Sequence, residues 1–319
     1  MQILIFGAGA VGLGLGSCLI ASGHTVHLIG REDTVSALSI DGLERRGLFG
    51  AHHAAPFEFS AFCSVEELEA TAYDFVLVCT KSFDTRAAAE ALASSPALRA
   101  EPTQFVLCQN GWGNAEVFAA FFPSEQIKNA RVITGFRRHQ PNQVEITVHA
   151  DSIHLGSLFG DSLEVLRPLA RALGEGGLPC EVTEHIERDL WAKMLYNCML
   201  NGLATLFGVP YGLLGESEMT RELMARVAQE IFEVLAASGL STHWTCAANY
   251  LEEFYARLLP PTYRHEPSML QDVRAHKPTE IDALNGAVVA LGKKHGVNTP
   301  VNLTVHHLVR FLEQQAPRH

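Results

Sequence analysis

Three polar side chains interrupt the most apolar helical segment of the chain, and their types suit the binding and protonation of a small molecule. The segment covers residues 189–206 (DLWAKMLYNCMLNGLATL), and Lys193, Asn197 and Asn201 recur in it every fourth residue. This spacing places the three side chains along one face of a helix. Because a buried ammonium needs a partner or a cavity, the stripe indicates the wall of a substrate site. The alternative is a lysine that reaches solvent beside two asparagines that tie helices together.

A second group of polar residues lies in SMLQDVRAHKPTEIDALNG, residues 268–286. Ser268 is expected to begin a helix, and Pro278 to end or kink it. Glu280 and Asp282 then open a further helix whose apolar face is set by the residues that follow. A carboxylate here suits acid–base chemistry. The two acids could equally be first-turn residues that favour the dipole of that helix.

The first thirty-one residues predict how a nucleotide is held. Residues 2–6 read as a buried strand, 10–22 as a helix and 25–29 as a parallel strand, with G-x-G-x-x-G at the first turn. In this context the glycines allow a sharp turn, the approach of a pyrophosphate and close packing of helix on sheet. Five glycines and the lack of a basic leader argue against a signal peptide or membrane helix. The predicted cofactor-binding backbone comprises Gly7, Ala8, Gly9, Ala10, Val11 and Gly12.

The residue at the end of the second strand bears on the choice of cofactor. That strand closes on Ile29-Gly30-Arg31, and a guanidinium there suits the 2′-phosphate of NADP. Glu32 and Asp33 follow at once and are alternative ligands for the ribose hydroxyl of NAD. The sequence therefore favours NADP(H) and leaves NAD as the alternative.

Two further polar residues follow buried strands of the same predicted sheet. Lys81 follows the apolar run FVLVCT (75–80), and Asn110 follows the strand 104–109. Ligands of open α/β sheets gather at the carboxyl ends of strands, so both are candidates for the cofactor or substrate site. Asn110 also precedes a glycine, as a simple turn residue does.

Composition limits the classes of function. The net charge of −11 argues against nucleic-acid or anionic-membrane partners, and no other long apolar run occurs, so a soluble cytoplasmic protein is expected. Seven cysteines, mostly in apolar runs and without C-x-x-C, predict reduced core thiols. The fifteen histidines are scattered without a ligand pattern, so no metal site is expected.

The order of elements predicts an α/β protein with two domains: an N-terminal Rossmann-type, doubly wound sheet (1–184) and a C-terminal all-helical domain (185–319). Small antiparallel strands at a sheet edge are expected over 41–62. An antiparallel extension is expected over 127–156, with strands at 130–136, 143–149 and 152–155. Arg137-Arg138 is interpreted as a solvated turn. From about residue 186 the periodicity is helical to the end.

Taken together, these motifs resemble those of the ketopantoate reductases (2-dehydropantoate 2-reductases), over essentially the whole chain. The resemblance rests on GAGAVG, CTKSFDT, QNGWGN, LWAKMLYNCMLN, SMLQDVRAHKPTEIDALNG and GVNTPVN, in this order and spacing. It implies NADPH-dependent reduction of a small 2-oxo acid, ketopantoate being the expected substrate in pantothenate biosynthesis. A homodimer is left open.

The resemblance also assigns roles to individual residues. It implies that Lys193 is the catalytic lysine and Glu280 its acidic partner, which either orients the lysine or contacts the substrate. The residues implied to hold the substrate are Asn110, Asn197, Asn201 and Ser268, and those implied to contact the cofactor beyond the glycine turn are Arg31, Lys81 and Asn110.

The chain departs from the family pattern beside the implied substrate. Tyr211 and His265 stand where relatives often have asparagine, so the pocket around the hydroxyl end of the substrate is expected to differ. Two other functions stay open: a related β-hydroxyacid or opine-type dehydrogenase, and a non-catalytic NADP(H)-binding sensor. Retention of both Lys193 and Glu280 argues against the sensor.

Overall fold

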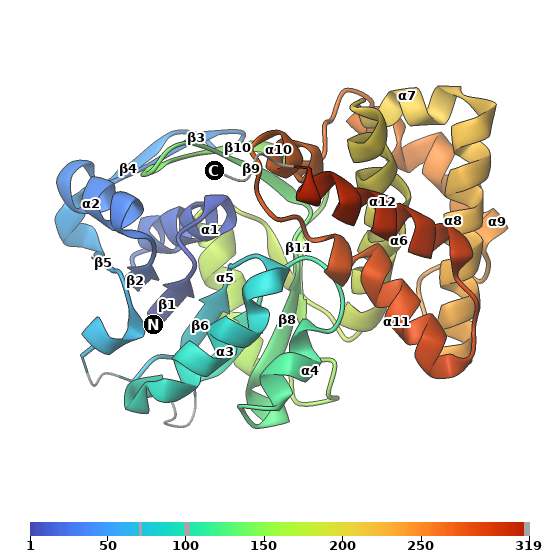
Figure 1. Ribbon diagram of the computed structural model, residues 1–319. Coiled ribbons are helices and arrows are strands. Elements are labelled where there is room, and N and C mark those ends of the chain that lie inside the picture. The colour runs from blue at the N-terminus through green and yellow to red at the C-terminus, as the bar shows by residue number, and fades with distance from the viewer. Residues whose placement is uncertain (70–71, 99–102, 316–319) are drawn as a thin grey trace. The chain divides into compact units, whose positions relative to one another are not determined.

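The computed structural model describes residues 1–69, 72–98 and 103–315, and it divides into two compact units (Figure 1). The first unit comprises Met1–Gln109 and Asn114–Ile186, and the second comprises Asn110–Gly113 together with the chain from Glu187 onward. The division therefore falls after Ile186, whereas the sequence placed the domain boundary after residue 184. Nothing in the sequence predicted that the short segment Asn110–Gly113 groups with the second unit.

The main sheet of the first unit is eight-stranded within the described residues, with the order β12-β11-β8-β7-β6-β1-β2-β5. β1 pairs in parallel with β2 and β6, and only the pair β8 and β11 is antiparallel. This central parallel arrangement confirms the predicted Rossmann-type sheet. Its strands are β1 (Gln2–Phe6), β2 (Thr25–Ile29), β5 (Ser60–Phe62), β6 (Phe75–Val78), β7 (Gln104–Leu107), β8 (Ile127–Arg131), β11 (Ile153–Gly156) and β12 (Cys180–Val182).

A second sheet in the first unit confirms part of the expectation for 41–62 and 127–156 and corrects the rest. Residues 43–47 and 52–54 pair antiparallel, as do 134–140 and 143–149. Its order is β4-β3-β10-β9, with β3 (Leu43–Gly47), β4 (His52–Ala54), β9 (Thr134–Gln140) and β10 (Gln143–His149). The strand predicted over 130–136 is in fact two strands in different sheets, β8 and β9. β5 pairs in parallel with β2, not antiparallel as predicted. Arg137-Arg138 lies within β9 instead of a turn, and Arg138 donates to Asp33 at 3.3 Å.

Helix α1 (Ala10–Ala21) packs against this second sheet as well as the main sheet. A Cβ added at Gly14 of α1 would lie 2.3 Å from the Phe136 ring of β9, so only a residue without a side chain allows this contact. From β3, the buried Arg45 donates through Nη1 to Sγ of Cys18 in α1 and to the carbonyl of Gly176, both at 2.9 Å. The glycine-rich first helix is therefore shaped by packing on its outer side as well as by the turn that precedes it.

The remaining helices of the first unit are α2 (Glu32–Asp41), α3 (Thr85–Ser94), α4 (Asn114–Ala119) and α5 (Arg167–Glu175). α2 was not predicted, because its sequence, EDTVSALSID, has little apolar periodicity. It begins directly after Arg31, so the candidate phosphate ligand precedes the first turn of a helix. Glu32 and Asp33, the alternative ribose ligands, lie in that first turn.

The described part of the second unit contains helices and no strand, as predicted. Its longest helix, α6 (Ile186–Phe207), carries the Lys193, Asn197 and Asn201 stripe and otherwise buries apolar residues such as Trp191 and Leu195. It shares one buried apolar cluster with α7 (Tyr211–Glu216), α8 (Glu218–Ser238), α9 (Ala247–Glu253), α10 (Ser268–Arg274), α11 (Asn285–His295) and α12 (Pro300–Gln314). Ser268 begins α10 as expected, and α10 ends at Arg274, four residues before Pro278.

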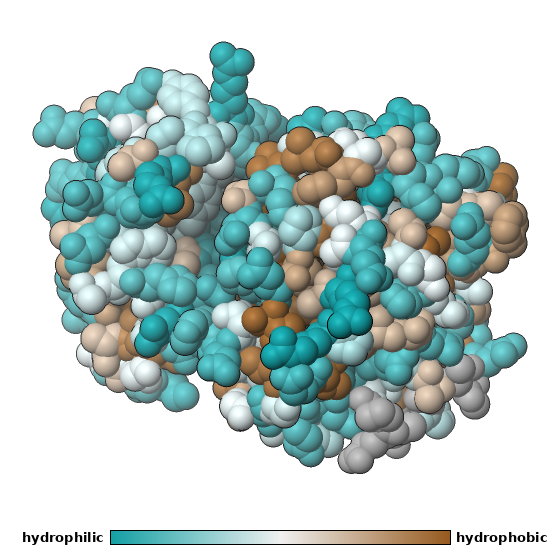
Figure 2. Space-filling model, turned by 180° about the vertical axis from the view of Figure 1, so that it is seen from behind, coloured by the Kyte–Doolittle hydropathy of each residue, from teal (hydrophilic) through white to brown (hydrophobic). Residues whose placement is uncertain are grey.

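The surface of the molecule is largely hydrophilic on the face seen in Figure 2, where apolar residues form scattered groups. Within the described residues, no helix has the length and apolar character that a membrane span requires. Three of the seven cysteines, Cys18, Cys108 and Cys198, are buried free thiols, in line with the expectation of core thiols. Cys63 and Cys246 are free but exposed, and so depart from that expectation.

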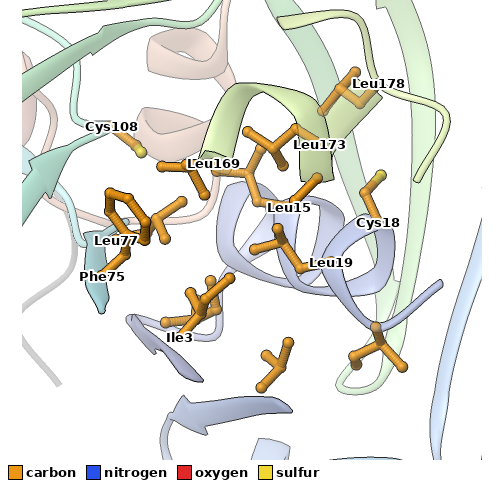
Figure 3. Close-up of a cluster of buried hydrophobic side chains, with 14 of the residues drawn as sticks. Ile3, Leu15, Cys18, Leu19, Phe75, Leu77, Cys108, Leu169, Leu173 and Leu178 are labelled. Atoms are coloured by element: carbon orange, nitrogen blue, oxygen red, sulfur yellow. The ribbon is translucent and has the colours of Figure 1, made fainter. Parts of the chain in front are cut away.

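The core of the first unit lies on both faces of the main sheet. In β1, Ile3 and Ile5 join the cluster under α1 and α5, whereas Leu4 joins the cluster on the opposite face. Figure 3 shows part of the first cluster, where side chains of α1 and α5 such as Leu15 and Leu169 meet those of the sheet. Burial on both faces accounts for the continuous apolar runs of these strands. The glycine turn therefore follows a strand that is packed on both of its faces.

Candidate active site

An asparagine links the lysine and the glutamate that the sequence singled out. Lys193 Nζ donates to Asn110 Oδ1 at 2.7 Å, and Asn110 Nδ2 donates to Glu280 Oε2 at 3.0 Å. The amide oxygen faces the ammonium and the amide N–H faces the carboxylate, which is the one orientation that suits both charges. All three residues belong to the second unit. The structure therefore assembles a cation, a polarised amide and an anion in one chain of hydrogen bonds.

The backbone beside Asn110 is held by the segment that carries Glu280. Trp112 N donates to the carbonyl oxygen of Ala283 at 2.9 Å, and the Trp112 ring packs on that of Trp191, with centroids 4.8 Å apart. Trp191 lies half a turn before Lys193 on α6. These contacts fix the segment that carries Asn110 against the elements that carry Lys193 and Glu280. The position of Asn110 therefore depends on tertiary contacts as well as on its turn.

Glu280 does not sit where the helix-dipole alternative requires. It precedes a short 3₁₀ turn, Ile281–Ala283, and no acidic residue lies in the first turn of α11. Its side chain is 6% exposed and turns to Asn110, whereas Asp282 is exposed and bonds His306 at 2.7 Å. The dipole of α11 therefore explains neither acid, and the two carboxylates have different environments.

The other residues implied to hold the substrate differ in their engagement. The side chains of Asn197, which is partly buried, and of Ser268, which is exposed, make no hydrogen bond to any described residue. Asn201 Oδ1 accepts a hydrogen bond from the Tyr211 hydroxyl at 2.5 Å. The sequence left open that the two asparagines tie helices together. Asn201 does so, because its bond to Tyr211 joins α6 to α7, whereas Asn197 makes no such bond.

The glycine turn of the first unit has the geometry of a nucleotide cradle. Gly7 has φ +108°, and the amides of Gly7 and Ala8 donate to the carbonyl of Ile29 at 3.0 and 2.8 Å. A Cβ added at Gly9 would meet no atom within 4 Å, and no side chain caps α1. Open space beside uncapped helix amides suits a phosphate group. This turn therefore fits the pyrophosphate of a dinucleotide.

Substitution of Gly12 is expected to disrupt this turn. A Cβ at position 12 would lie 2.1 Å from Gly7 O and 2.9 Å from Ile5 Cγ2. Overpacking of this kind costs about 1–3 kcal/mol, so Gly12→Ala should lower the melting temperature and weaken NADPH binding. Gly174→Ala is the matched control, because a Cβ at that helical position would meet nothing within 4 Å. A Gly12→Ala protein as stable as the control would contradict the packing assigned to this turn.

The remaining candidate cofactor ligands lie at the ends of neighbouring elements of the first unit. The Arg31 side chain is exposed and makes no hydrogen bond within the described part of the chain. Asp33 is ion-paired with Arg138 at 3.3 Å, which weakens its case as a ribose ligand. Lys81 follows β6, and its carbonyl accepts from Gln109 Nε2 at 3.4 Å. Among the described residues, no cluster of three or more His, Cys, Asp or Glu could hold a metal ion.

Comparison with known proteins shows which family shares these features. The model of "Ketopantoate reductase PanE/ApbA" matches residues 3–160, and the model of its C-terminal domain matches residues 185–313. A 2-dehydropantoate 2-reductase from Aquifex aeolicus (strain VF5) is 37% identical over 98% of this chain and 97% of its own length. The chain belongs to the ketopantoate reductase family. It is thus an oxidoreductase, and the resemblance found in the sequence is confirmed.

Two solved structures are similar to this chain over nearly its whole length. A 2-dehydropantoate 2-reductase from Geobacter metallireducens GS-15 has a TM-score of 0.88 and 28% identity, covering 98% of this chain and 99% of that one. A D-mandelate dehydrogenase with NADH and anilino(oxo)acetate has a TM-score of 0.86 and 28% identity over the same shares. That dehydrogenase supports a nicotinamide dinucleotide as the class of cofactor, and the family implies a small-molecule substrate.

Proposed function

We propose that this ketopantoate reductase family member uses NADPH to reduce a 2-oxo acid to a 2-hydroxy acid, with ketopantoate, the precursor of pantoate in pantothenate biosynthesis, as its substrate. The observation that carries the proposal is the hydrogen-bonded chain of Lys193, Asn110 and Glu280. A sensor that only binds the cofactor has no need of it. The cytoplasmic location and the homodimer stay predictions.

The chemistry assigns a separate task to each of these residues. Bound NADPH would supply a hydride to the keto carbon, and the keto oxygen then develops negative charge. The Lys193 ammonium would stabilise that charge and transfer its proton to the oxygen, which completes the hydroxyl group. Asn110 would hold the ammonium through its amide oxygen, and Glu280 would hold the amide. Solvent then returns a proton to Lys193.

The cofactor would be held by the glycine turn and by Arg31 of the first unit. The turn at residues 7–12 would hold the pyrophosphate, with the amides of residues 10–12 as donors because those of Gly7, Ala8 and Gly9 already bond within the fold. The Arg31 guanidinium would pair with the 2′-phosphate. Lys81 and Asn110 are proposed to complete the contacts to the cofactor, and Asn197, Asn201 and Ser268 those to the substrate. Hydrogen-bonding groups of Asn197 and Ser268 that the fold leaves unused support this assignment.

Loss of the Arg31 side chain is expected to erode the preference for NADPH. A charge-assisted hydrogen bond contributes about 1.5–3 kcal/mol, which is on the order of tenfold to a hundredfold in affinity. Dissociation constants of NADPH and NADH should therefore converge in Arg31→Ala. Arg46→Ala is the control, because Arg46 is an exposed arginine of the same unit that pairs with Glu44. Equal affinity of the unmodified protein for both cofactors would refute the assignment of NADP(H).

The proposed reaction is tested by NADPH oxidation with ketopantoate beside a panel of 2-oxo acids that includes phenylglyoxylate. The D-mandelate dehydrogenase structure makes an aromatic 2-oxo acid the second candidate substrate. A panel repeated with amines present separates an opine-type dehydrogenase, which would need the amine. Binding of NADPH without its oxidation by any of these acids would favour the sensor and defeat the proposal.

A further inference from the structure

The Tyr211 hydroxyl determines which way the Asn201 amide faces. Tyr211 is 4% exposed, and its hydroxyl bonds Asn201 Oδ1 and no other described residue. A buried O–H that donates to nothing is unfavourable. Because Asn201 is its one available acceptor, the amide oxygen must face Tyr211. Burial also raises the pKa of the Tyr211 hydroxyl well above its usual value near 10, so it keeps its proton and remains a donor.

The opposite side of the amide is left open. Asn201 is 8% exposed; its Nδ2 makes no hydrogen bond to a described residue and keeps part of the accessible surface of the side chain. Asn201 shares its helix face with Lys193 and Asn197. The edge of Asn201 that is open to a ligand is therefore a hydrogen-bond donor, while its acceptor is already occupied.

Aromatic packing keeps Tyr211 in place. Its ring lies 5.1 Å from that of His265 and 5.8 Å from that of Tyr196, and its backbone N–H donates to the His265 carbonyl at 3.0 Å. Tyr196 uses its own hydroxyl elsewhere, on Thr262 Oγ1 at 2.5 Å. The two tyrosines are thus neighbours with the same chemistry, and within the described residues only the Tyr211 hydroxyl bonds a residue of the Lys193 stripe.

We propose that Tyr211 is a positioning residue that fixes Asn201 as a hydrogen-bond donor to an acceptor oxygen of the 2-oxo acid. This inference rests on the proposed function, since it concerns the substrate of that reaction. Two oxygens offer the required chemistry, the carboxylate and the hydroxyl at the far end of ketopantoate. Either accepts from Nδ2, whereas a substrate group that can only donate finds no acceptor on Asn201.

The test removes the Tyr211 hydroxyl and keeps its ring. In Tyr211→Phe the Asn201 oxygen loses its donor and the amide is free to turn, so KM should rise roughly threefold to tenfold with little change in kcat. Tyr196→Phe is the matched control and should leave KM within about twofold, because the Tyr196 hydroxyl bonds Thr262 and no residue of the stripe. In an Asn201→Ala background Tyr211→Phe should have no further effect, because Tyr211 acts through Asn201.

The choice of substrates separates the two oxygens. Ketopantoate and 3,3-dimethyl-2-oxobutanoate share the carboxylate, but only ketopantoate carries the distal hydroxyl. A rise in KM for both identifies the carboxylate as the group held, and a rise for ketopantoate alone identifies the hydroxyl oxygen. Unchanged KM for both in Tyr211→Phe, or an equal effect of Tyr196→Phe, would overturn the inference and leave the proposed reaction intact. Turnover of neither acid by the unmodified protein would defeat both.

Discussion

Replacement of Lys193 by alanine is expected to lower kcat by about a hundredfold to ten-thousandfold, the range for loss of a general acid. The ammonium is the cation that the structure places at the head of the hydrogen-bonded chain through Asn110 to Glu280. In the proposed reaction its loss removes both the proton donor and the positive charge assigned to the keto oxygen. Steady-state NADPH oxidation at saturating ketopantoate measures the effect.

Two controls separate a chemical effect of Lys193→Ala from a structural one. The affinity for NADPH should change little, because the glycine turn and Arg31 belong to the first unit and Lys193 to the second. Lys293→Ala removes an exposed lysine of α11 in the same unit and should leave kcat unchanged. A Lys193→Ala protein with near-normal turnover would remove the central claim about this site.

Replacement of Glu280 by glutamine is expected to slow turnover roughly tenfold to a hundredfold, with the fold intact. Glutamine keeps an oxygen that can accept from Asn110 but loses the negative charge that polarises the amide toward Lys193. A hydrogen bond to a charged group contributes about 1.5–3 kcal/mol, and each 1.36 kcal/mol is tenfold in rate. The same loss follows if Glu280 instead accepts from the hydroxyl of the product.

Asp282→Asn is the matched control for Glu280→Gln. Asp282 lies two residues away, is exposed, and pairs with His306 at 2.7 Å. Its substitution should change the free energy of unfolding by less than about 0.5 kcal/mol and leave turnover near normal. If Glu280→Gln also keeps near-normal turnover, the role proposed for this carboxylate in the reaction is refuted.

The local part of the cofactor site could be predicted from the sequence. The strand 2–6, the glycine turn, the helix that follows and the strand 25–29 all lie where the pattern placed them. Each depends on neighbouring residues: strand burial on an apolar run, the turn on glycine at φ +108°, and the helix on its period. The stripe on α6 was predictable for the same reason, because helical spacing alone puts residues 193, 197 and 201 on one face.

The pairings within the second sheet were not predictable in this way. β3 pairs in parallel with β10, about a hundred residues along the chain, and the short strands carry no signal for that partner. The position of Arg138 was not predictable either. The pair Arg137-Arg138 was interpreted as a solvated turn, but Arg138 lies in β9 and donates to Asp33 of α2. Both outcomes depend on which elements pack together, and local propensity does not contain that information.

For this protein, the types of residue in the site follow from the sequence, and their connections follow from the tertiary structure. The stripe and the carboxylate singled out Lys193 and Glu280, but Asn110 lies 83 residues before one and 170 before the other. Tyr211 was noted only as a departure from the family pattern, and its bond to Asn201 depends on the turn that joins α6 to α7. Hydrogen bonds form between groups that packing brings within about 3 Å, and packing of distant segments is decided by the whole core.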